Sequence, residues 1–223
     1  MPWVEKERTA LVATLRASDP DGPTLCEGWN VRRLLAHLVQ REHDLVGGVR
    51  DIVSRAEPGR EKNLSTLTDG ARTPEGYQAL VGRFSEGPPR WSPMSWAGEN
   101  INLLEYVIHH EDVRRAGSTP AAPRPLPDAE SQSIWSKLLL VARLTFRASP
   151  VGVILAQPGG QSSVVKNGVV KNGVVKKGEP SVTLTGAPVE LALYLNGRRT
   201  SAAVEVTGPP DAVLTFTSWL TAR

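Results

Sequence analysis

The sequence predicts an α+β protein in which an N-terminal four-helix bundle is followed by a small α/β module. Apolar residues recur at helical spacing through the first two-thirds of the chain, whereas the last third contains short apolar or alternating runs typical of strands. Between them, residues 118–128 include four prolines and cannot continue a helix. With 223 residues, 40% of them apolar, the chain can bury a core without disulfide bonds.

The four helices of the bundle are predicted from periodicity together with start and stop signals. Asn30 is a suitable N-cap for the second helix, and Thr73 followed by Pro74 is a strong start for the third. Turn segments rich in glycine and proline follow the first three helices. The predicted helices cover about residues 4–15, 31–53, 74–86 and 100–116.

The rest of the chain has a different texture. A helix is predicted over residues 129–147, and we place the domain boundary after it, giving domains 1–147 and 148–223. The second domain is predicted to contain strands over 151–156, 181–185 and 202–206 and helices over 188–195 and 210–220. The repeat VVKNG, VVKNG, VVKKG over 164–178 predicts a hairpin whose register is ambiguous, because its Asn-Gly pairs compete to form the turn.

Composition excludes several functional classes. The 26 basic and 23 acidic residues are mixed along the chain, which does not favour nucleic-acid binding. No apolar stretch approaches the 18 residues of a membrane span, and the charged N-terminus does not resemble a signal peptide. A single cysteine, Cys26, cannot form an internal disulfide, so we expect a cytoplasmic protein.

Two predicted helices carry side chains that could share a metal ion. Glu105 and His109 are four residues apart and therefore lie on one helix face, beside the apolar stripe. His37 lies at the flank of the apolar face of the second helix, whereas His43 is expected on the opposite, solvated side. Two imidazoles and one carboxylate with a vacant fourth position are typical of catalytic metal sites, and they suit zinc best, with nickel as an alternative.

Each of these assignments has a simpler alternative. A Glu and a His four apart often occur by chance, and a single flanking histidine is usually a hydrogen-bonded structural residue. His110 could replace His109 as ligand if the helix were rotated. Cys26 could be a redox or metal-binding thiolate, although such a cysteine is more often a small buried apolar group.

Two further residues could support the site. Asp112 could orient a ligand imidazole from outside the coordination sphere. It could equally form a salt bridge with Arg41 or Arg115. Arg198 follows a predicted turn in the second domain and could contact an anionic substrate. The simpler interpretation is that Arg198 is solvated.

Three segments resemble a known family. TLCEGWNVRRLLAHL (24–38) and NLLEYVIHHEDVRRA (102–116) resemble the two metal-binding motifs of the DinB-like superfamily, which includes mycothiol-dependent maleylpyruvate isomerases. The resemblance implies that His37, Glu105 and His109 hold the metal. GEPSVTLTGAPVELALYLNGRR resembles the sterol-carrier-like C-terminal domain of several members. Arg33 stands where the family commonly has an acidic residue, and the VVKNG repeat resembles an expansion of a strand connection.

The function that follows is that of a metal-dependent enzyme using a low-molecular-weight thiol of the mycothiol type as cosubstrate. The metal would favour the thiolate, which would attack an electrophilic small molecule in an isomerase or thiol-transferase reaction. The alternative is a non-catalytic metal-binding protein whose C-terminal module binds an apolar ligand or a partner. The sequence leaves the substrate, the metal and the oligomeric state open.

Overall fold

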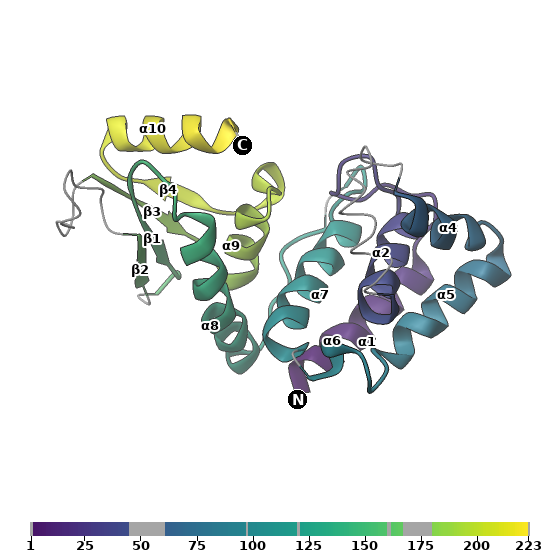
Figure 1. Ribbon diagram of the computed structural model, residues 1–223. Coiled ribbons are helices and arrows are strands. Elements are labelled where there is room, and N and C mark those ends of the chain that lie inside the picture. The colour runs from purple at the N-terminus through teal and green to yellow at the C-terminus, as the bar shows by residue number, and fades with distance from the viewer. Residues whose placement is uncertain are drawn as a thin grey trace. The chain divides into compact units, whose positions relative to one another are not determined.

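The computed structural model describes residues 2–44, 61–96, 98–119, 121–159, 162–166 and 180–222 (Figure 1). The chain divides into two compact units, Met1–Ala122 and Pro123–Arg223. The first is helical and the second contains a small sheet, so the predicted α+β class is confirmed. Among the helices of the described residues, none is both long and apolar enough to cross a bilayer.

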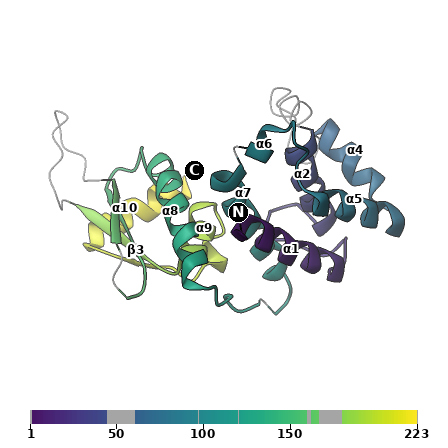
Figure 2. The ribbon, with the colours of Figure 1, turned by 90° about the horizontal axis from the view of Figure 1, so that it is seen from below.

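The N-terminal unit is built from helices α1, α2, α5 and α7, which pack side by side (Figures 1 and 2). Helix α1 contacts α5 and α7, and α2 contacts α5 and the short helix α4. All four predicted helices are present, whereas α4 and α6 were not predicted. The predicted continuation of the second helix over 45–53 lies outside the described residues. The bounds are α1 (Pro2–Ala17), α2 (Val31–His43), α4 (Lys62–Gly70), α5 (Pro74–Glu86), α6 (Pro93–Trp96) and α7 (Gly98–Arg114).

The helix starts follow from their caps. The Asn30 side chain accepts a hydrogen bond from the backbone N–H of Arg33 at 2.9 Å, as an N-cap of α2 requires. Thr73 caps α5 in the same way, and Pro74 occupies its first turn. These contacts are local in sequence, which explains why the sequence alone predicted both starts.

A buried polar cluster joins three helices of the bundle. Arg8 of α1 donates through Nη2 to Glu42 of α2 at 3.2 Å and to the hydroxyl of Tyr106 of α7 at 2.6 Å. The Tyr106 hydroxyl in turn donates to Glu42. Burial raises the pKa of Glu42, although the Arg8 charge opposes this effect. The cluster therefore fixes α2 against α7, the two helices that carry the predicted metal ligands.

The C-terminal unit contains a four-stranded sheet in the order β2-β1-β3-β4. Strands β1 and β3 are parallel, and the outer pairs are antiparallel. Helix α8 packs on α9 and β2, and α10 packs on β3. The bounds are α8 (Asp128–Thr145), β1 (Gly152–Ala156), β2 (Ser162–Lys166), β3 (Ser181–Thr185), α9 (Pro188–Leu195), a 3-10 turn (Arg199–Ser201), β4 (Glu205–Thr207) and α10 (Pro210–Thr221).

Two details differ from the sequence analysis or fall outside what the structure describes. The sequence placed the domain boundary after residue 147, whereas the compact units divide between Ala122 and Pro123, because α8 packs against the elements of the second unit. Strand β2 includes residues 164–166 of the VVKNG repeat. The remaining repeat residues, 167–178, lie outside the described residues, so the register of the hairpin stays a prediction.

Candidate metal centre

The structure brings the three predicted ligands together between α2 and α7. The Nε2 atom of His37 lies 3.3 Å from Oε1 of Glu105. The Nε2 atom of His109 lies 3.2 Å from the same oxygen. The three ligand atoms all lie within 4.8 Å of one another. We call His37, Glu105 and His109 the metal cradle.

The donor separations in the cradle fit a small divalent ion. Nitrogen and oxygen ligands bind tetrahedral zinc at about 2.0 to 2.1 Å, which places two such ligands about 3.3 Å apart. The 3.2 and 3.3 Å separations to Glu105 match this value. The donor types, two imidazoles and a carboxylate, also suit a borderline metal. The assignment of these residues as ligands stays a prediction, and this geometry supports it.

Two of the three cradle side chains are partly exposed. The side chains of His37 and Glu105 are 29% and 27% exposed, whereas that of His109 is 9% exposed. His109 therefore forms the inner wall, and a small molecule could approach over His37 and Glu105. Such access is needed by a site that takes an exogenous ligand.

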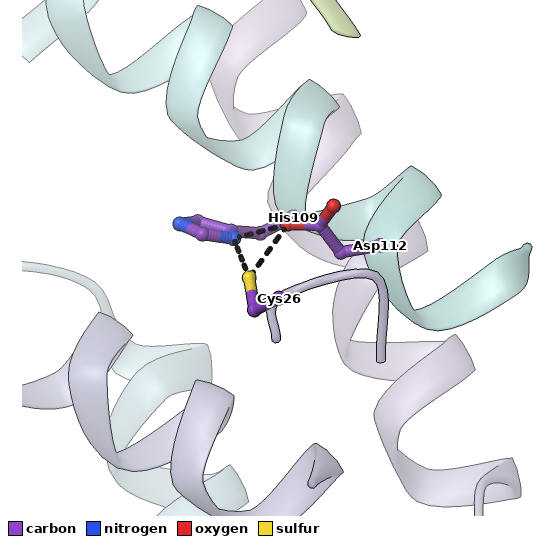
Figure 3. A group of neighbouring side chains, drawn as sticks. All are labelled: Cys26, His109 and Asp112. Carbon is purple, nitrogen blue, oxygen red and sulfur yellow. Dashed lines mark hydrogen bonds and ion pairs between the residues drawn. The ribbon is translucent and has the colours of Figure 1, made fainter. Parts of the chain in front are cut away.

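Asp112 contacts the far edge of the His109 ring. Its Oδ2 atom lies 2.8 Å from Nδ1 of His109, and its side chain is fully buried. A proton held on Nδ1 by this carboxylate leaves the Nε2 lone pair for a metal, which is the contact that the predicted orienting role of Asp112 requires. The thiol of Cys26 donates to the same Oδ2 atom at 3.1 Å (Figure 3).

Charge complementarity stabilises the cradle before any ion binds. Burial raises the pKa of Glu105, but hydrogen bonds with His109 and His37 and the charge of Arg41 outweigh burial, so this pKa lies well below its usual range. Burial lowers the pKa of His109, but its hydrogen bonds, above all that with Asp112, raise it well above 6.5. Without metal, Glu105 is therefore a carboxylate and His109 an imidazolium near neutral pH.

Comparisons with known proteins agree with this geometry. Residues 4–114 match the family described as the mycothiol maleylpyruvate isomerase N-terminal domain. The N-terminal bundle belongs to that family. No curated protein matches the chain.

Two crystal structures are similar to the whole chain. One is the mycothiol-dependent maleylpyruvate isomerase, with a TM-score of 0.55 and 15% identity. The other is a histidine-to-alanine mutant of the mycothiol-dependent maleylpyruvate isomerase, with a TM-score of 0.57 and 14% identity. Each match covers 92% of this chain and 90% of the other. At these identities the likeness shows a shared fold alone.

Two residues of this maleylpyruvate isomerase-like bundle were missed as neighbours of the cradle. Arg41 lies with its Nε atom 3.6 Å from Oε1 of Glu105, and its Nη1 donates to Asn102 at 2.8 Å. Its position four residues after His37 places it on the same helix face, a signal that could have identified it. The ring of Trp29 packs against that of His37, with 5.2 Å between the ring centroids. Trp29 lies in the loop before α2, where periodicity gives no information.

The other two histidines lie outside the cradle. His110 directs Nδ1 to Glu7 at 2.8 Å and Nε2 to Thr14 at 2.7 Å, so both ring nitrogens are engaged by α1. The expectation that His43 is solvated was wrong. Its side chain is 11% exposed, and burial lowers its pKa, because α5 packs against this part of α2.

The two arginines that the sequence offered as salt-bridge partners of Asp112 pair with glutamates. Arg115 pairs with Glu111 at 2.6 Å, and Arg41 pairs with Glu105. Arg198 lies in the C-terminal unit, directly before the 3-10 turn, where its Nη1 donates to the carbonyl of Asn196 at 2.5 Å. A role for Arg198 in binding an anionic substrate stays a prediction.

Proposed function

We propose that the protein is a divalent-metal-dependent enzyme that uses a low-molecular-weight thiol of the mycothiol type in an isomerase or thiol-transferase reaction. The convergence of His37, Glu105 and His109 at zinc-like donor separations, with two of these side chains partly exposed, is the observation that carries the proposal. The family of the N-terminal bundle supports mycothiol as the thiol. Zinc is the proposed metal, with nickel as the alternative.

The surrounding residues suit an anionic ligand at this position. When bound, a divalent ion supplies positive charge that favours the thiolate form of a thiol near neutral pH. Asp112 keeps the His109 ring oriented through the 2.8 Å contact with Nδ1. Arg41 adds a positive charge beside Glu105 and offsets the negative charge of that ligand. The positive charges of the ion and of Arg41 favour binding of a thiolate.

The reaction then needs little from the protein in the way of proton transfer. In thiol transfer, the thiolate sulfur bonds to an electrophilic carbon and displaces a leaving group, which departs with its bonding electron pair. In isomerisation, the sulfur adds to one carbon of an activated double bond, and the π electrons move onto the activating group. The carbon–carbon bond, now single, rotates, and the same electrons restore the double bond as the carbon–sulfur bond breaks and releases the thiolate. Which electrophile is used depends on parts of the site that recognise the substrate.

Cobalt substitution tests the proposal directly. The experiment uses a Cys26→Ser variant, so that sulfur can come only from the added thiol. Addition of mycothiol should produce a thiolate-to-cobalt charge-transfer band, since a three-ligand site keeps exchangeable positions that a soft donor can occupy. Glu105→Gln in the same background should weaken the band.

His43→Ala provides a matched control, because His43 lies on α2 but outside the cradle. This variant should show the same band as its parent. If mycothiol, glutathione and cysteine all leave the spectrum unchanged while cobalt stays bound, the enzyme proposal fails. The non-catalytic metal-binding protein is then the better description.

A further inference from the structure

His109 lies between two carboxylates, one at each ring nitrogen. Glu105 lies 3.2 Å from Nε2, and Asp112 lies 2.8 Å from Nδ1. A neutral imidazole carries a proton on only one nitrogen, and the other nitrogen has the lone pair that binds a metal. The tautomer of His109 therefore decides which edge of the ring can act as a ligand.

The Nδ1 edge of the ring faces a second set of metal-binding atoms (Figure 3). The sulfur of Cys26 lies 4.0 Å from Nδ1 of His109 and 3.1 Å from Oδ2 of Asp112. A tetrahedral ion bound to sulfur at about 2.3 Å and to nitrogen and oxygen at about 2.0 to 2.1 Å separates these donors by about 3.3 to 3.6 Å. Side-chain shifts of roughly half an ångström would bring the three donors to those separations.

The backbone holds Cys26 in this place. The N–H of Leu25 donates to the carbonyl oxygen of Asp112 at 3.0 Å, which ties the loop to α7. The N–H of Trp29 donates to the carbonyl of Cys26 at 3.0 Å and closes a tight turn. Gly28 in that turn has a φ of 74°, a value that glycine adopts without strain. The sulfur is therefore positioned by contacts that do not depend on a bound ion.

We propose that Cys26, His109 Nδ1 and Asp112 form a second metal position, which takes thiophilic divalent ions such as cobalt or cadmium. Binding releases two protons to solvent, the thiol proton of Cys26 and the Nδ1 proton of His109, so that the sulfur and the Nδ1 lone pair both bind the ion. The remaining ring proton resides on Nε2 and donates to Glu105. Because His109 serves the two positions in opposite tautomers, the second position and the metal cradle are mutually exclusive.

Charge and burial favour the second position for a soft ion. A thiolate and a carboxylate neutralise a divalent ion completely, which suits a site where the side chain of Asp112 is fully buried and that of His109 is 9% exposed. The cradle contains one carboxylate and leaves one positive charge. This inference goes beyond the proposed function and does not require it, since the donors of the second position include neither His37 nor Glu105.

The test uses His37→Ala, which removes a ligand of the cradle and leaves the second position intact. With excess cobalt and no added thiol, this variant should bind one ion per chain and show a thiolate-to-cobalt charge-transfer band. The double variant His37→Ala/Cys26→Ser should lose the band. Cys26→Ser alone should bind cobalt in the cradle and show no such band.

Three results would overturn the proposal: cobalt bound to His37→Ala without the band, no cobalt bound to it, or a band that survives in the double variant. Far-UV circular dichroism establishes whether His37→Ala is folded. If it is not, cadmium NMR of the wild-type protein replaces it. A resonance in the sulfur-coordinated range that Cys26→Ser abolishes supports the second position, and its absence overturns it.

Discussion

The imidazole of His109 contacts a carboxylate on each side, and this arrangement makes metal binding a proton-releasing reaction. The pKa of His109 lies well above 6.5 in the metal-free protein, so the ring carries two protons at pH 7. A metal at Nε2 must displace one of them. Because the pKa is raised, the metal competes with this proton throughout the neutral range, and affinity increases with pH until the pH exceeds that pKa.

We therefore expect zinc binding to the cradle of a Cys26→Ser variant near pH 7 to release about one proton per ion. Isothermal titration calorimetry in buffers of different ionisation enthalpy measures this number directly. An observed enthalpy that does not vary with the buffer would contradict a protonated His109.

The ligand assignment predicts a selective loss of metal. In a Cys26→Ser background, His37→Ala and His109→Ala should each lose most of the bound zinc, because two remaining protein donors hold the ion poorly. His43→Ala in the same background should retain it. Elemental analysis after dialysis measures the zinc content of each variant. Full zinc occupancy in both ligand variants would show that the cradle is not the zinc site.

Asp112→Asn tests the orienting contact. An amide preserves the shape of the buried side chain but removes its charge and can present N–H to Nδ1 of His109. Loss of such a partner typically lowers metal affinity by about 10- to 100-fold. Competition with a chromophoric chelator measures the affinity. Unchanged affinity would show that α7 alone determines the orientation of the ring.

At the level of the helices, the buried Arg8–Glu42–Tyr106 cluster determines how α2 faces α7. Arg8→Met should destabilise the protein by about 3 to 5 kcal/mol, because it leaves the buried Glu42 without its cationic partner. Urea denaturation measures the loss. The double variant Arg8→Met/Glu42→Leu should recover much of the stability, and a double variant as unstable as the single one would argue against an uncompensated charge.

The helices that sequence predicted well are those with local signals. Caps at Asn30 and Thr73 and regular apolar spacing determine α2 and α5 within a few residues of chain. Helix α4 has no side-chain hydrogen bond at its cap and buries only Leu64 among its nine residues, so neither signal was present. Burial of His43 depends on packing against α5, which lies about 40 residues later in the sequence. The residues next to His43 in the sequence give no sign of this contact.

The cradle was predictable for the same reason. Glu105 and His109 share a helix, so their spacing alone places them together, and His37 was placed by its position on the α2 face. The contact of Cys26 with Asp112 joins a loop to a helix across 86 positions. Sequence spacing cannot show this contact, and so the second donor set became apparent only in three dimensions.

For the chain as a whole, the predicted ligands all lie in the first unit, Met1–Ala122. The described residues between Gly117 and Asp128 form no helix or strand and are mostly exposed. Limited proteolysis should therefore cleave the chain there. Zinc should remain with the N-terminal fragment in size-exclusion chromatography coupled to elemental analysis. Zinc that leaves on cleavage, while the fragment stays folded, would show that the second unit contributes to metal binding.

The turn closed by Cys26 and Trp29 links two features that act on different histidines. The turn places the sulfur beside Asp112 and the indole beside His37. Gly28 makes this turn possible because glycine, which has no side chain, adopts the left-handed backbone conformation without strain. Inserting or deleting one residue between them would displace one of the two. The pattern Cys-x-Gly-Trp, combined with an Asp three residues after the second ligand histidine, is thus a sequence marker of the second metal position. Relatives that carry both parts should be vulnerable to cadmium at this histidine, and relatives that lack the cysteine should be resistant.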